Sequence, residues 1–408
     1  MRLLYVADGR SPITLNWLQG MIERGHEVHL ATTFASNPGL KLASLTTIPV
    51  AFSGLQSAPP YAPAKPSSGG IGSLLRGARG IRLRAHLRHW AGPLTIPRAA
   101  VELRTLIERL QPDLVHALRI PFEGMLAAAA DPSVPLIVSV WGNDFTLHAP
   151  AAPGMRRRTQ RTLQRAQGLH TDCRRDLRLA RRWGWAGAGP EIVLPGNGGV
   201  RTSIFYPGPP APRSESIAAR TLATIPAQSP VVINPRGFRA YVHNQTFFQA
   251  IPGVLQSHPD AIFLCPAMAG EARAEGWLER LKIHKALRLL PKLHPEEMAA
   301  LYRRALVSVS PSSHDGTPNT LLEALACGCF PIAGDLESIR EWIEPGRNGL
   351  LIDPRDPKAL ADAIRRAFDD HALHRTAVLQ NLELIRARAA QGSVIQQIEA
   401  FYRSLAST

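Results

Sequence analysis

The sequence predicts an α/β protein of two similar-sized halves, each a parallel sheet covered by helices. Apolar segments of strand length alternate with segments of helix length from the first residue onward. A stretch rich in Pro, Ser and Ala at 206–229 interrupts the alternation, which then starts again. The chain has 408 residues, enough for two or three domains, and is 45% hydrophobic and 19% charged, as soluble globular proteins are.

The N-terminal half begins with an apolar segment at 2–7. The chain start is too short and too soon polar for a secretion signal, so this segment predicts a buried strand of a cytoplasmic protein. No apolar run approaches the ~20 residues that a membrane-spanning helix needs. We expect strands at 2–7, 26–32, 46–51, 114–118, 136–140 and 192–194, and helices at 14–24, 101–110 and 122–130.

The second alternation follows the break and predicts a second sheet. We expect strands at 231–234, 261–265, 307–310 and 330–333, and helices at 245–256, 272–282, 296–304, 320–327, 360–368 and 380–405. The domains are then 1–205, with an inserted basic segment at 53–95, a linker at 206–229, a second domain at 230–385 and a C-terminal helix at 386–408. A cleft between the two halves is the expected ligand site.

The charge is the unusual feature of the composition. There are 47 basic and 32 acidic residues, a net charge of +15, and all but six of the basic residues are Arg. Genomic bias toward Arg codons is one explanation, and attraction to nucleotide phosphates, an anionic membrane surface or nucleic acid is another. The segment 71–90 has five Arg and no acid among apolar residues, which suits an amphipathic helix on anionic lipid or an exposed basic helix that covers the sheet. The ten Arg of 154–185 form either a solvated face or a surface for an anionic acceptor.

The cysteines and acids give no metal signature. The four Cys are too few and too scattered for a disulfide framework or a zinc site, and no Asp-x-Asp motif occurs. We therefore expect no metal and no resident cofactor.

The segment 310–328 is the most informative part of the chain. A strand ends at Ser310, Pro318 fits the first helical position with Thr317 as cap, and the helix ends at Gly328. The amides of 316–320 are then free to bind an anion or a sugar hydroxyl. Inside the helix, the Glu323 carboxylate could accept two hydrogen bonds from a vicinal diol such as a ribose, with Asp315 at the mouth of the loop. The plainer alternative makes Asp315 a turn residue and Glu323 a surface residue, but leucines flank Glu323.

This segment resembles the acid-x7-Glu signature of retaining GT-B glycosyltransferases of family 4, the glycosyl transferases group 1. Asp315 stands where the family usually has Glu, and Glu323 matches the second acid, which in the family holds the nucleotide ribose. The following loop matches the family's contacts to the sugar and the diphosphate, so the implied donor-binding residues are Gly316, Thr317, Pro318, Asn319, Thr320 and Glu323. The stretch 341–354 resembles the family's C-terminal region.

The block 234–244 resembles the family's phosphate-gripping loop. Arg236 aligns with the family's Arg, the expected Lys is absent, and Arg239 and then His243 are the nearest basic candidates. Guanidinium groups would stabilise the charge of a departing diphosphate. A solvated turn is the alternative. The resemblance thus implies Arg236, Arg239, Asp315 and Glu323 as catalytic residues.

The first half offers weaker candidates for the acceptor side. Asn143 and Asp144 follow a strand in a Trp-Gly-Asn-Asp turn, and Asp144 could accept a hydrogen bond from an acceptor hydroxyl. His116 ends a strand, where a lone His is more often structural. Arg10 lies in the turn after the first strand, in the place of the family's glycine loop.

The resemblance implies two Rossmann-like domains facing each other across a cleft, with the C-terminal helix crossing back to the N-terminal domain. The implied reaction is metal-independent, retaining transfer of a sugar from a UDP- or GDP-sugar to a hydroxyl of a glycan, lipid-linked or small-molecule acceptor, the nucleotide-sugar being a substrate and not a cofactor. The alternatives are a nucleotide-sugar epimerase or hydrolase on the same fold, and a non-enzymatic binder of anionic surfaces. A nucleotide oxidoreductase lacks its Gly-x-Gly-x-x-Gly motif here. No nucleic acid partner is expected, and 71–90 is the candidate contact to the inner face of a membrane.

Overall fold

The computed structural model describes residues 1–53, 87–187, 189–239 and 241–406. By its internal contacts the chain divides into two units, one of Met1–Gly199 with Gly392–Thr408 and one of Val200–Gln391. Most of the predicted basic segment at 71–90 lies outside the described residues. No helix in the described ranges is both long and apolar enough to cross a lipid bilayer.

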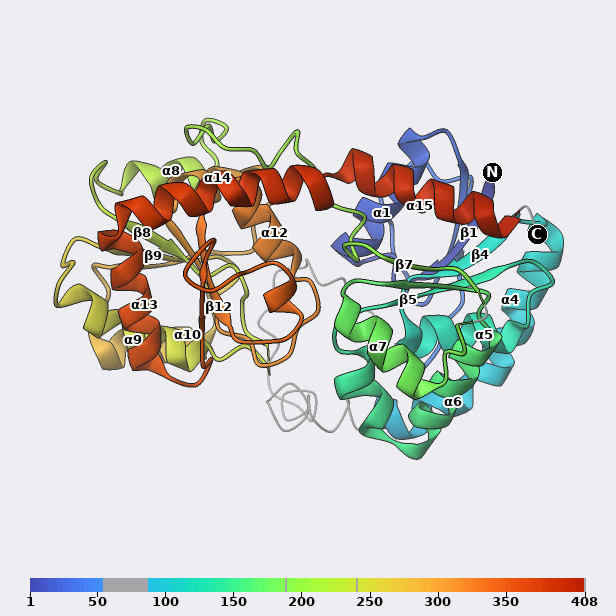
Figure 1. The fold of residues 1–408 in the computed structure, drawn as a ribbon. Coiled ribbons are helices and arrows are strands. Elements are labelled where there is room, and N and C mark those ends of the chain that lie inside the picture. Colours follow the sequence, from blue (N-terminus) through green and yellow to red (C-terminus); the bar gives the residue numbers. More distant parts are fainter. Residues whose placement is uncertain (54–86, 188, 240, 407–408) are drawn as a thin grey trace. The chain divides into compact units, whose positions relative to one another are not determined.

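The first unit is built on a seven-stranded parallel sheet (Figure 1). Its strand order is β3-β2-β1-β4-β5-β6-β7, so the direction of winding reverses between β1 and β4. The strands are β1 (Arg2–Ala7), β2 (Glu27–Thr32), β3 (Ser44–Thr47), β4 (Leu114–Ala117), β5 (Leu136–Val140), β6 (Gly168–Thr171) and β7 (Glu191–Val193). The helices are α1 (Pro12–Glu23), α4 (Ile96–Leu110), α5 (Met125–Ala130), α6 (Pro153–Arg165), α7 (Arg174–Trp183) and α15 (Gln391–Ala406), with short helical turns at η2 (Gly92–Thr95), η3 (Ile120–Gly124), η4 (Asp144–His148) and η5 (Ala149–Ala151).

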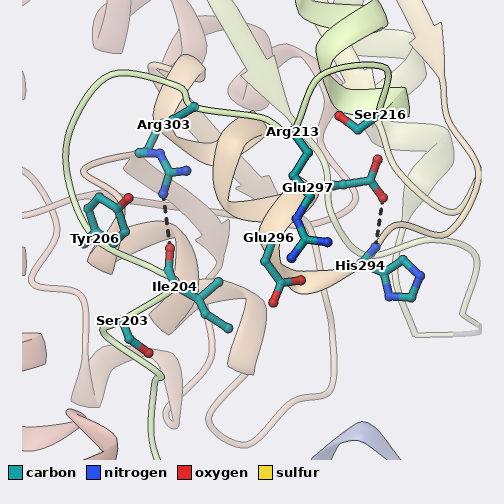
Figure 2. Close-up of a pocket in the computed structure, with 10 residues that line it drawn as sticks. Ser203, Ile204, Tyr206, Arg213, Ser216, His294, Glu296, Glu297 and Arg303 are labelled. Carbon is teal, nitrogen blue, oxygen red and sulfur yellow. Dashed lines mark hydrogen bonds between the residues drawn. The ribbon is translucent and has the colours of Figure 1, made fainter.

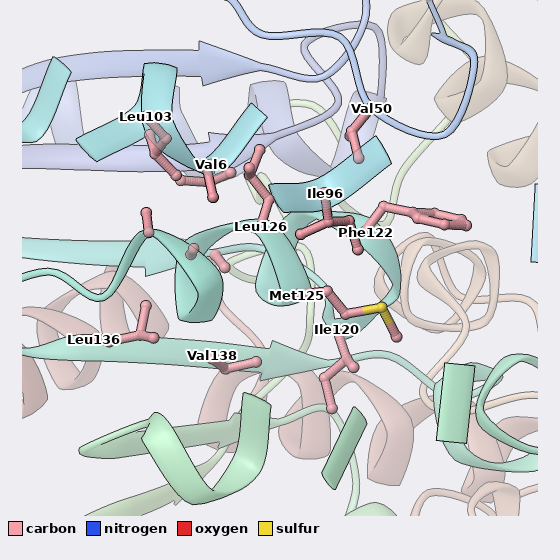
Figure 3. Close-up of a cluster of buried hydrophobic side chains, with 14 of the residues drawn as sticks. Val6, Val50, Ile96, Leu103, Ile120, Phe122, Met125, Leu126, Leu136 and Val138 are labelled. Carbon is pink, nitrogen blue, oxygen red and sulfur yellow. The ribbon is translucent and has the colours of Figure 1, made fainter. Parts of the chain in front are cut away.

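One face of this sheet is covered by α4, α5 and α6. Val6, Leu126 and Val138 are fully buried in the cluster of apolar side chains that Figure 3 shows. The strands are apolar on both sides because helices cover both faces of a parallel sheet.

The other face is covered by α1 and α15. Tyr402 of α15 is fully buried, and its hydroxyl lies 3.1 Å from the Tyr5 hydroxyl and 2.6 Å from Nδ1 of His116, while it accepts a hydrogen bond from Nε1 of Trp17 at 3.2 Å. A Cβ added at Gly168 would lie 2.6 Å from Leu405, so the absence of a side chain there lets α15 approach β6. The prediction that the C-terminal helix returns to the N-terminal domain is confirmed.

The second unit is built on a six-stranded parallel sheet of order β10-β9-β8-β11-β12-β13. Its strands are β8 (Val231–Ile233), β9 (Ile262–Cys265), β10 (Leu287–Leu289), β11 (Val307–Ser310), β12 (Phe330–Gly334) and β13 (Leu350–Ile352). Its helices are α8 (Ile217–Ala223), α9 (Asn244–Leu255), α10 (Ala272–Leu281), α11 (Pro295–Arg304), α12 (Asn319–Ala326), α13 (Pro357–Asp369) and α14 (His371–Arg388), with η6 at Ile339–Glu341. Two apolar clusters form its core, one on each side of the sheet.

The structure differs from the prediction in several elements. The helix expected at 380–405 is two helices, α14 and α15, because Ala389 leaves helical geometry and the N–H of Gln391 donates to the Val200 carbonyl. The segment expected as a linker contains α8, whose Ala218 is fully buried in the second unit. The Arg-rich stretch at 154–185 holds α6, β6 and α7, and β10 and β13 were not predicted.

Candidate active site of the second unit

The loop between β11 and α12 is fixed by residues from the following segment. The Ser338 hydroxyl donates to the Asp315 carbonyl at 2.7 Å, and Nε1 of Trp342 donates to the Thr317 hydroxyl at 3.0 Å. The N-cap of α12 is Pro318 and not Thr317, since Pro318 is extended (ψ 125°) and the helix begins at Asn319. At the other end of α12, Gly328 takes a left-handed conformation (φ +88°), as the sequence predicts.

Arg236 joins the two sequence blocks that were predicted to bind the donor. Its Nη2 lies 2.6 Å from Oδ2 of Asp315, and its Nη1 donates to the Thr320 hydroxyl at 3.2 Å. Both members of this ion pair are largely buried, with side-chain exposures of 11% and 13%. The Nε of Arg236 is buried and has no hydrogen-bond partner among the described residues. The fold therefore places one guanidinium at the start of α12.

The loop after β8 is held by two buried asparagines. Asn234 donates to Oδ1 of Asn244 at 2.9 Å and accepts from the Arg236 N–H, while Asn244 donates to the Gly237 carbonyl at 2.7 Å. Gly237 has a positive φ of 60°, which fits the absence of a side chain at this turn. These bonds fix the backbone from which Arg236 extends.

Arg239 and His243, the other basic candidates of this loop, differ from Arg236. Arg239 is exposed, and its Nη1 donates to the Phe238 carbonyl at 3.1 Å. His243 is partly buried, and its Nε2 has no hydrogen-bond partner in the described part of the chain. Burial lowers the pKa of His243, and the Arg355 charge lowers it further. Both effects disfavour the charged form of the imidazole.

The start of α12 leaves amide groups available. Within the described ranges, no acceptor takes the N–H of Gly316, Asn319 or Thr320. Such amides at the positive end of a helix dipole bind phosphate oxygens.

Glu323 lies on α12 without a hydrogen-bond partner among the residues described. Burial raises its pKa to about 8, and the charge of Arg201 opposes this rise. The Glu323 side chain is nevertheless partly exposed, and a carboxyl group with so raised a pKa is typical of ligand sites.

The acceptor-side candidates of the first unit are in more structural positions. His116 is fully buried, with Nε2 2.8 Å from the Ser139 hydroxyl, and burial lowers its pKa well below its ordinary value. Asp144 is also buried, and its carboxylate accepts hydrogen bonds from Nε of Arg119 and from the N–H groups of Ile120 and Trp141. The structure does not bring His116 to the surface.

Arg10 and Asn143 lie nearer the surface. Arg10 binds Asp8 with two side-chain nitrogens, each at 3.0 Å, and stacks on the Phe34 ring at 3.5 Å. Oδ1 of Asn143 is buried and lacks a partner among the described residues. Of the four acceptor-side candidates, Asn143 and Arg10 are therefore the two with partly exposed side chains.

A pocket of about 420 Å³ lies elsewhere on the second unit, between the segment 203–216 and α11 (Figure 2). Arg303 lines it, donates to the Ile204 carbonyl at 3.1 Å and stacks on Tyr206. None of the predicted site residues lines this pocket.

A trio of potential metal ligands lies in the first unit. Ligand atoms of Asp172, Cys173 and Asp176 lie within 4.8 Å of one another. However, Arg175 lies 2.8 Å from Oδ1 of Asp176, and burial raises the pKa of Cys173 far above its ordinary value. A protonated thiol and a carboxylate neutralised by an Arg do not favour a cation there.

The residues that hold the site in place are not among those predicted from the sequence. Ser338 and Trp342 fix the 315–317 loop, and Asn234 and Asn244 fix the Arg236 loop. The two asparagines flank a turn after a strand, which is a signal for local side-chain to backbone bonds. Nothing in the spacing of Ser338 or Trp342 indicates their contacts.

Two family models match the chain. The model described as Glycosyl transferase 4-like domain matches residues 9–197, and the model described as Glycosyl transferases group 1 matches residues 231–370. One match therefore falls on each unit.

Curated relatives match part of the chain. The D-inositol 3-phosphate glycosyltransferase of Corynebacterium urealyticum is 28% identical over 222 residues, which are 52% of this chain and 51% of that protein. The glycogen synthase of Mycobacterium tuberculosis is 29% identical over 159 residues, 38% of this chain and 37% of that protein. The chain thus spans about half the length of the curated relatives it matches, or less.

Solved structures match over the whole chain. The sucrose-phosphate synthase from Thermosynechococcus elongatus has a TM-score of 0.72 at 18% identity, covering 99% of both chains. Anabaena HepE in complex with UDP and glucose has a TM-score of 0.72 at 15% identity, covering 99% of this chain and all of the other. At such identities the likeness shows a shared fold, and the predicted fold class is confirmed.

Proposed function

The chain belongs to the glycosyl transferases group 1 family, with the two-domain GT-B fold, and on this premise we propose that it transfers a sugar from a nucleotide-sugar to an acceptor hydroxyl. One observation carries the proposal: Arg236, paired with Asp315, lies at an α12 start whose amides are available. A diphosphate is the group that such a set of donors binds best.

The proposed roles follow from these positions. The α12 amides and Arg236 hold the diphosphate, and Glu323 accepts hydrogen bonds from the ribose diol. The bond between the anomeric carbon and the diphosphate oxygen breaks, and the acceptor oxygen bonds to that carbon on the same face. The acceptor proton passes to the departing diphosphate, so the chain supplies position and charge stabilisation and no nucleophile.

We propose a UDP- or GDP-sugar as donor, and the structure of Anabaena HepE in complex with UDP and glucose supports UDP. Metal independence is part of the proposal because the sequence has no Asp-x-Asp motif and offers Arg236 and backbone amides for the diphosphate. The acceptor is a glycan, a lipid-linked compound or a small molecule.

A donor panel tests the function. We expect one of the UDP-, GDP-, ADP- and dTDP-sugars to raise the unfolding temperature, and the same donor to release its nucleotide only when an acceptor is present. Proton NMR should show an unchanged anomeric configuration in the product, and EDTA should leave turnover unchanged. An epimerised donor without acceptor, or free sugar alone, would instead identify an epimerase or a hydrolase.

We also propose that the first unit docks on an anionic membrane surface, which would place the protein at the inner face of the membrane. Four large apolar side chains follow one another at helical spacing along 87–101, and all are exposed: Leu87 54%, Trp90 63%, Leu94 79% and Val101 61%. Monomeric proteins seldom expose such a stripe without a partner.

Positive charge beside the stripe favours lipid as this partner. The first turn of α6 packs against Pro93 of η2, where a Cβ at Gly154 would lie 3.5 Å from the Pro93 side chain. Helix α6 has five Arg and no acid, and Arg156, Arg157 and Arg161 are exposed. An apolar face bordered by Arg matches the charge of anionic headgroups.

Vesicle sedimentation tests the docking. We expect the protein to sediment with vesicles that contain phosphatidylglycerol and to stay in solution with phosphatidylcholine alone. Leu94→Ser should weaken sedimentation, whereas Leu379→Ser, at a 70% exposed leucine of α14, should not. Equal loss in both variants, no sedimentation, or a wild-type dimer that Leu94→Ser dissociates would overturn this docking.

A further inference from the structure

The point at which the winding of the first sheet reverses carries a cluster of charged side chains. β1 and β4 are neighbours there, and the loops after them contain Asp8 with Arg10 and then Arg119. In open α/β sheets, ligands bind outside the carboxyl ends of the strands at this reversal. The side chains of these loops are therefore candidates to bind a ligand.

Three guanidinium groups lie at this edge close enough for the charges of Arg10 and Arg119 to act on Arg88. Arg10 and Arg88 both stack on the Phe34 ring, at 3.5 Å and 5.3 Å from its centroid. Two of the three have a carboxylate of their own. Arg10 is bonded to Asp8 by two nitrogens, and Nε of Arg119 lies 2.9 Å from Oδ1 of Asp144.

Arg88 is different. Its guanidinium lies 4.6 Å from the Phe122 ring centroid, and its buried Nε has no hydrogen-bond partner in the described residues. No carboxylate of the described ranges forms an ion pair with it. Two aromatic faces thus hold a cation for which the described residues provide no ion-pair partner.

In the described part of the chain, the charges of two acids, Glu123 and Asp8, act on Arg88, and each of them is engaged elsewhere. Glu123 is buried and accepts a hydrogen bond from the Thr33 hydroxyl at 2.7 Å. Burial raises the pKa of Glu123, and the Thr33 hydrogen bond and the charges of Arg88 and Arg119 oppose this rise. Arg88 itself is partly exposed and can be reached by a ligand.

The backbone under this cluster is strained. Phe122 has a positive φ of 70° with ψ −50°, a conformation that bulky residues seldom adopt. Figure 3 shows its ring at the border of the apolar cluster. Such strain persists where the surrounding structure imposes it, and ligand sites are where it gathers. Here it sets the ring on which Arg88 stacks.

We propose that Arg88, with Arg10 and Arg119 beside it, binds a phosphate monoester on the sugar acceptor. This inference rests on the proposed glycosyl transfer and names the class of its acceptor. A phosphate monoester has close to two negative charges at neutral pH and several oxygens, and planar guanidinium groups bind such oxygens in pairs. It would supply the anion that Arg88 lacks.

Acceptor pairs test the assignment in the whole protein. Glucose and glucose 6-phosphate, and inositol and inositol phosphate, are offered with the donor that the panel identifies, and nucleotide release is measured. We expect the phosphorylated member of a pair to be preferred. Arg88→Gln should lower kcat/KM for that member about tenfold or more through KM, the loss of a charged hydrogen bond, and leave the unphosphorylated member unchanged. The matched control is Arg98→Gln, an exposed Arg on α4, which should change neither.

A second measurement needs no turnover. In an Arg236→Gln background, which weakens the donor site, binding of glucose 6-phosphate is measured by calorimetry with and without Arg88→Gln. A heat of binding that disappears with Arg88→Gln but not with Arg98→Gln supports the phosphate site. If this result is found but no acceptor reacts, the proposed glycosyl transfer is wrong and the phosphate site is not. Equal kcat/KM for both members of every pair, preference for a carboxylate acceptor such as glucuronate, or binding that ignores Arg88 would overturn the proposal.

Discussion

Arg236 and Arg239 are two residues of one loop with different surroundings. Arg236 reaches Asp315 and Thr320, whereas the Arg239 side chain is exposed and, among the described residues, donates to the Phe238 carbonyl alone. We expect Arg236→Gln to lower kcat by about 100-fold or more, because charge on the leaving diphosphate grows toward the transition state. Arg239→Gln should lower it less than tenfold. Steady-state kinetics with the identified donor measure both.

The two variants control each other. They remove the same charge from one loop, so a general effect of net charge would appear in both. A larger loss of kcat in Arg239→Gln than in Arg236→Gln would show that the arrangement of this loop without donor differs from the arrangement in which the reaction takes place.

Glu323 should make donor binding depend on pH. Its pKa is about 8 in the free protein because of burial, so the carboxyl is mostly protonated at pH 7. A diol donates two hydrogen bonds to a carboxylate but only one to a carboxylic acid that keeps its proton. We expect UDP affinity to rise between pH 7 and about 8 and then level off, with proton release on binding at pH 7. Calorimetry in buffers of different ionisation heat detects the proton.

The same group affects stability with a defined sign. An acid whose folded pKa is raised binds more protons folded than unfolded, so its contribution falls as pH rises from about 4.5, its ordinary value, toward 8. Glu323→Gln avoids this loss. We expect the variant to unfold at a higher temperature than the wild type at pH 8 and to bind UDP more weakly. A lower unfolding temperature at that pH would contradict the assigned burial.

At the scale of elements, α15 is held to the sheet by the Tyr402 hydroxyl. Tyr402→Phe leaves Tyr5, Trp17 and His116 without this partner, and each unsatisfied buried group costs about 1–3 kcal/mol. We expect the free energy of unfolding to fall by about 2 kcal/mol or more. Denaturant unfolding measures this.

Tyr302 provides the matched control. It is equally buried, but its hydroxyl has no hydrogen-bond partner in the described part of the chain. Tyr302→Phe should leave stability unchanged or raise it, since a buried hydroxyl without a partner is removed. Similar losses of stability in both variants would show that the hydrogen bonds of the Tyr402 hydroxyl are not the cause.

The elements that the sequence predicted well are those with a strong local signal. Strand β1 is apolar throughout, and the end of α12 at Gly328 follows from glycine's tolerance of positive φ. Strand β6 was not predicted, because its four residues lie between two helices that are rich in Arg. Short strands are identified by their pairing partners, which no local pattern contains.

The candidate site residues show the same contrast between local signals and contacts that are distant in sequence. Asp315, Glu323 and Arg236 were predicted from motif spacing, and the structure brings Arg236 to Asp315. His116 was offered for an acceptor, but its bonds to Tyr402 and Ser139 come from a helix and a strand far away in sequence. The position of Arg88 likewise depends on where the rings of Phe34 and Phe122 lie, which no local pattern in the sequence contains.

At the scale of the molecule, each unit has its own core, and the first needs residues from both ends of the described chain. Val394, Ile398 and Tyr402 are buried against β1, α1 and β4. We expect a chain of residues 1–390 to keep native hydrogen-exchange protection in β8–β13 and lose it in β1–β7. The second unit serves as the internal control. Equal protection in both sheets would show that α15 is dispensable.

The placement of α15 also orders events during synthesis. The ribosome synthesises the whole of 200–391 before α15 emerges. Until then, the face of the first sheet that contains Leu3, Tyr5 and Ile137 lacks the cover that α15 provides, whereas the second unit can already fold. For that interval the earlier-made half is the one that chaperones would have to shield, and a stall in translation just before residue 392 would prolong its exposure.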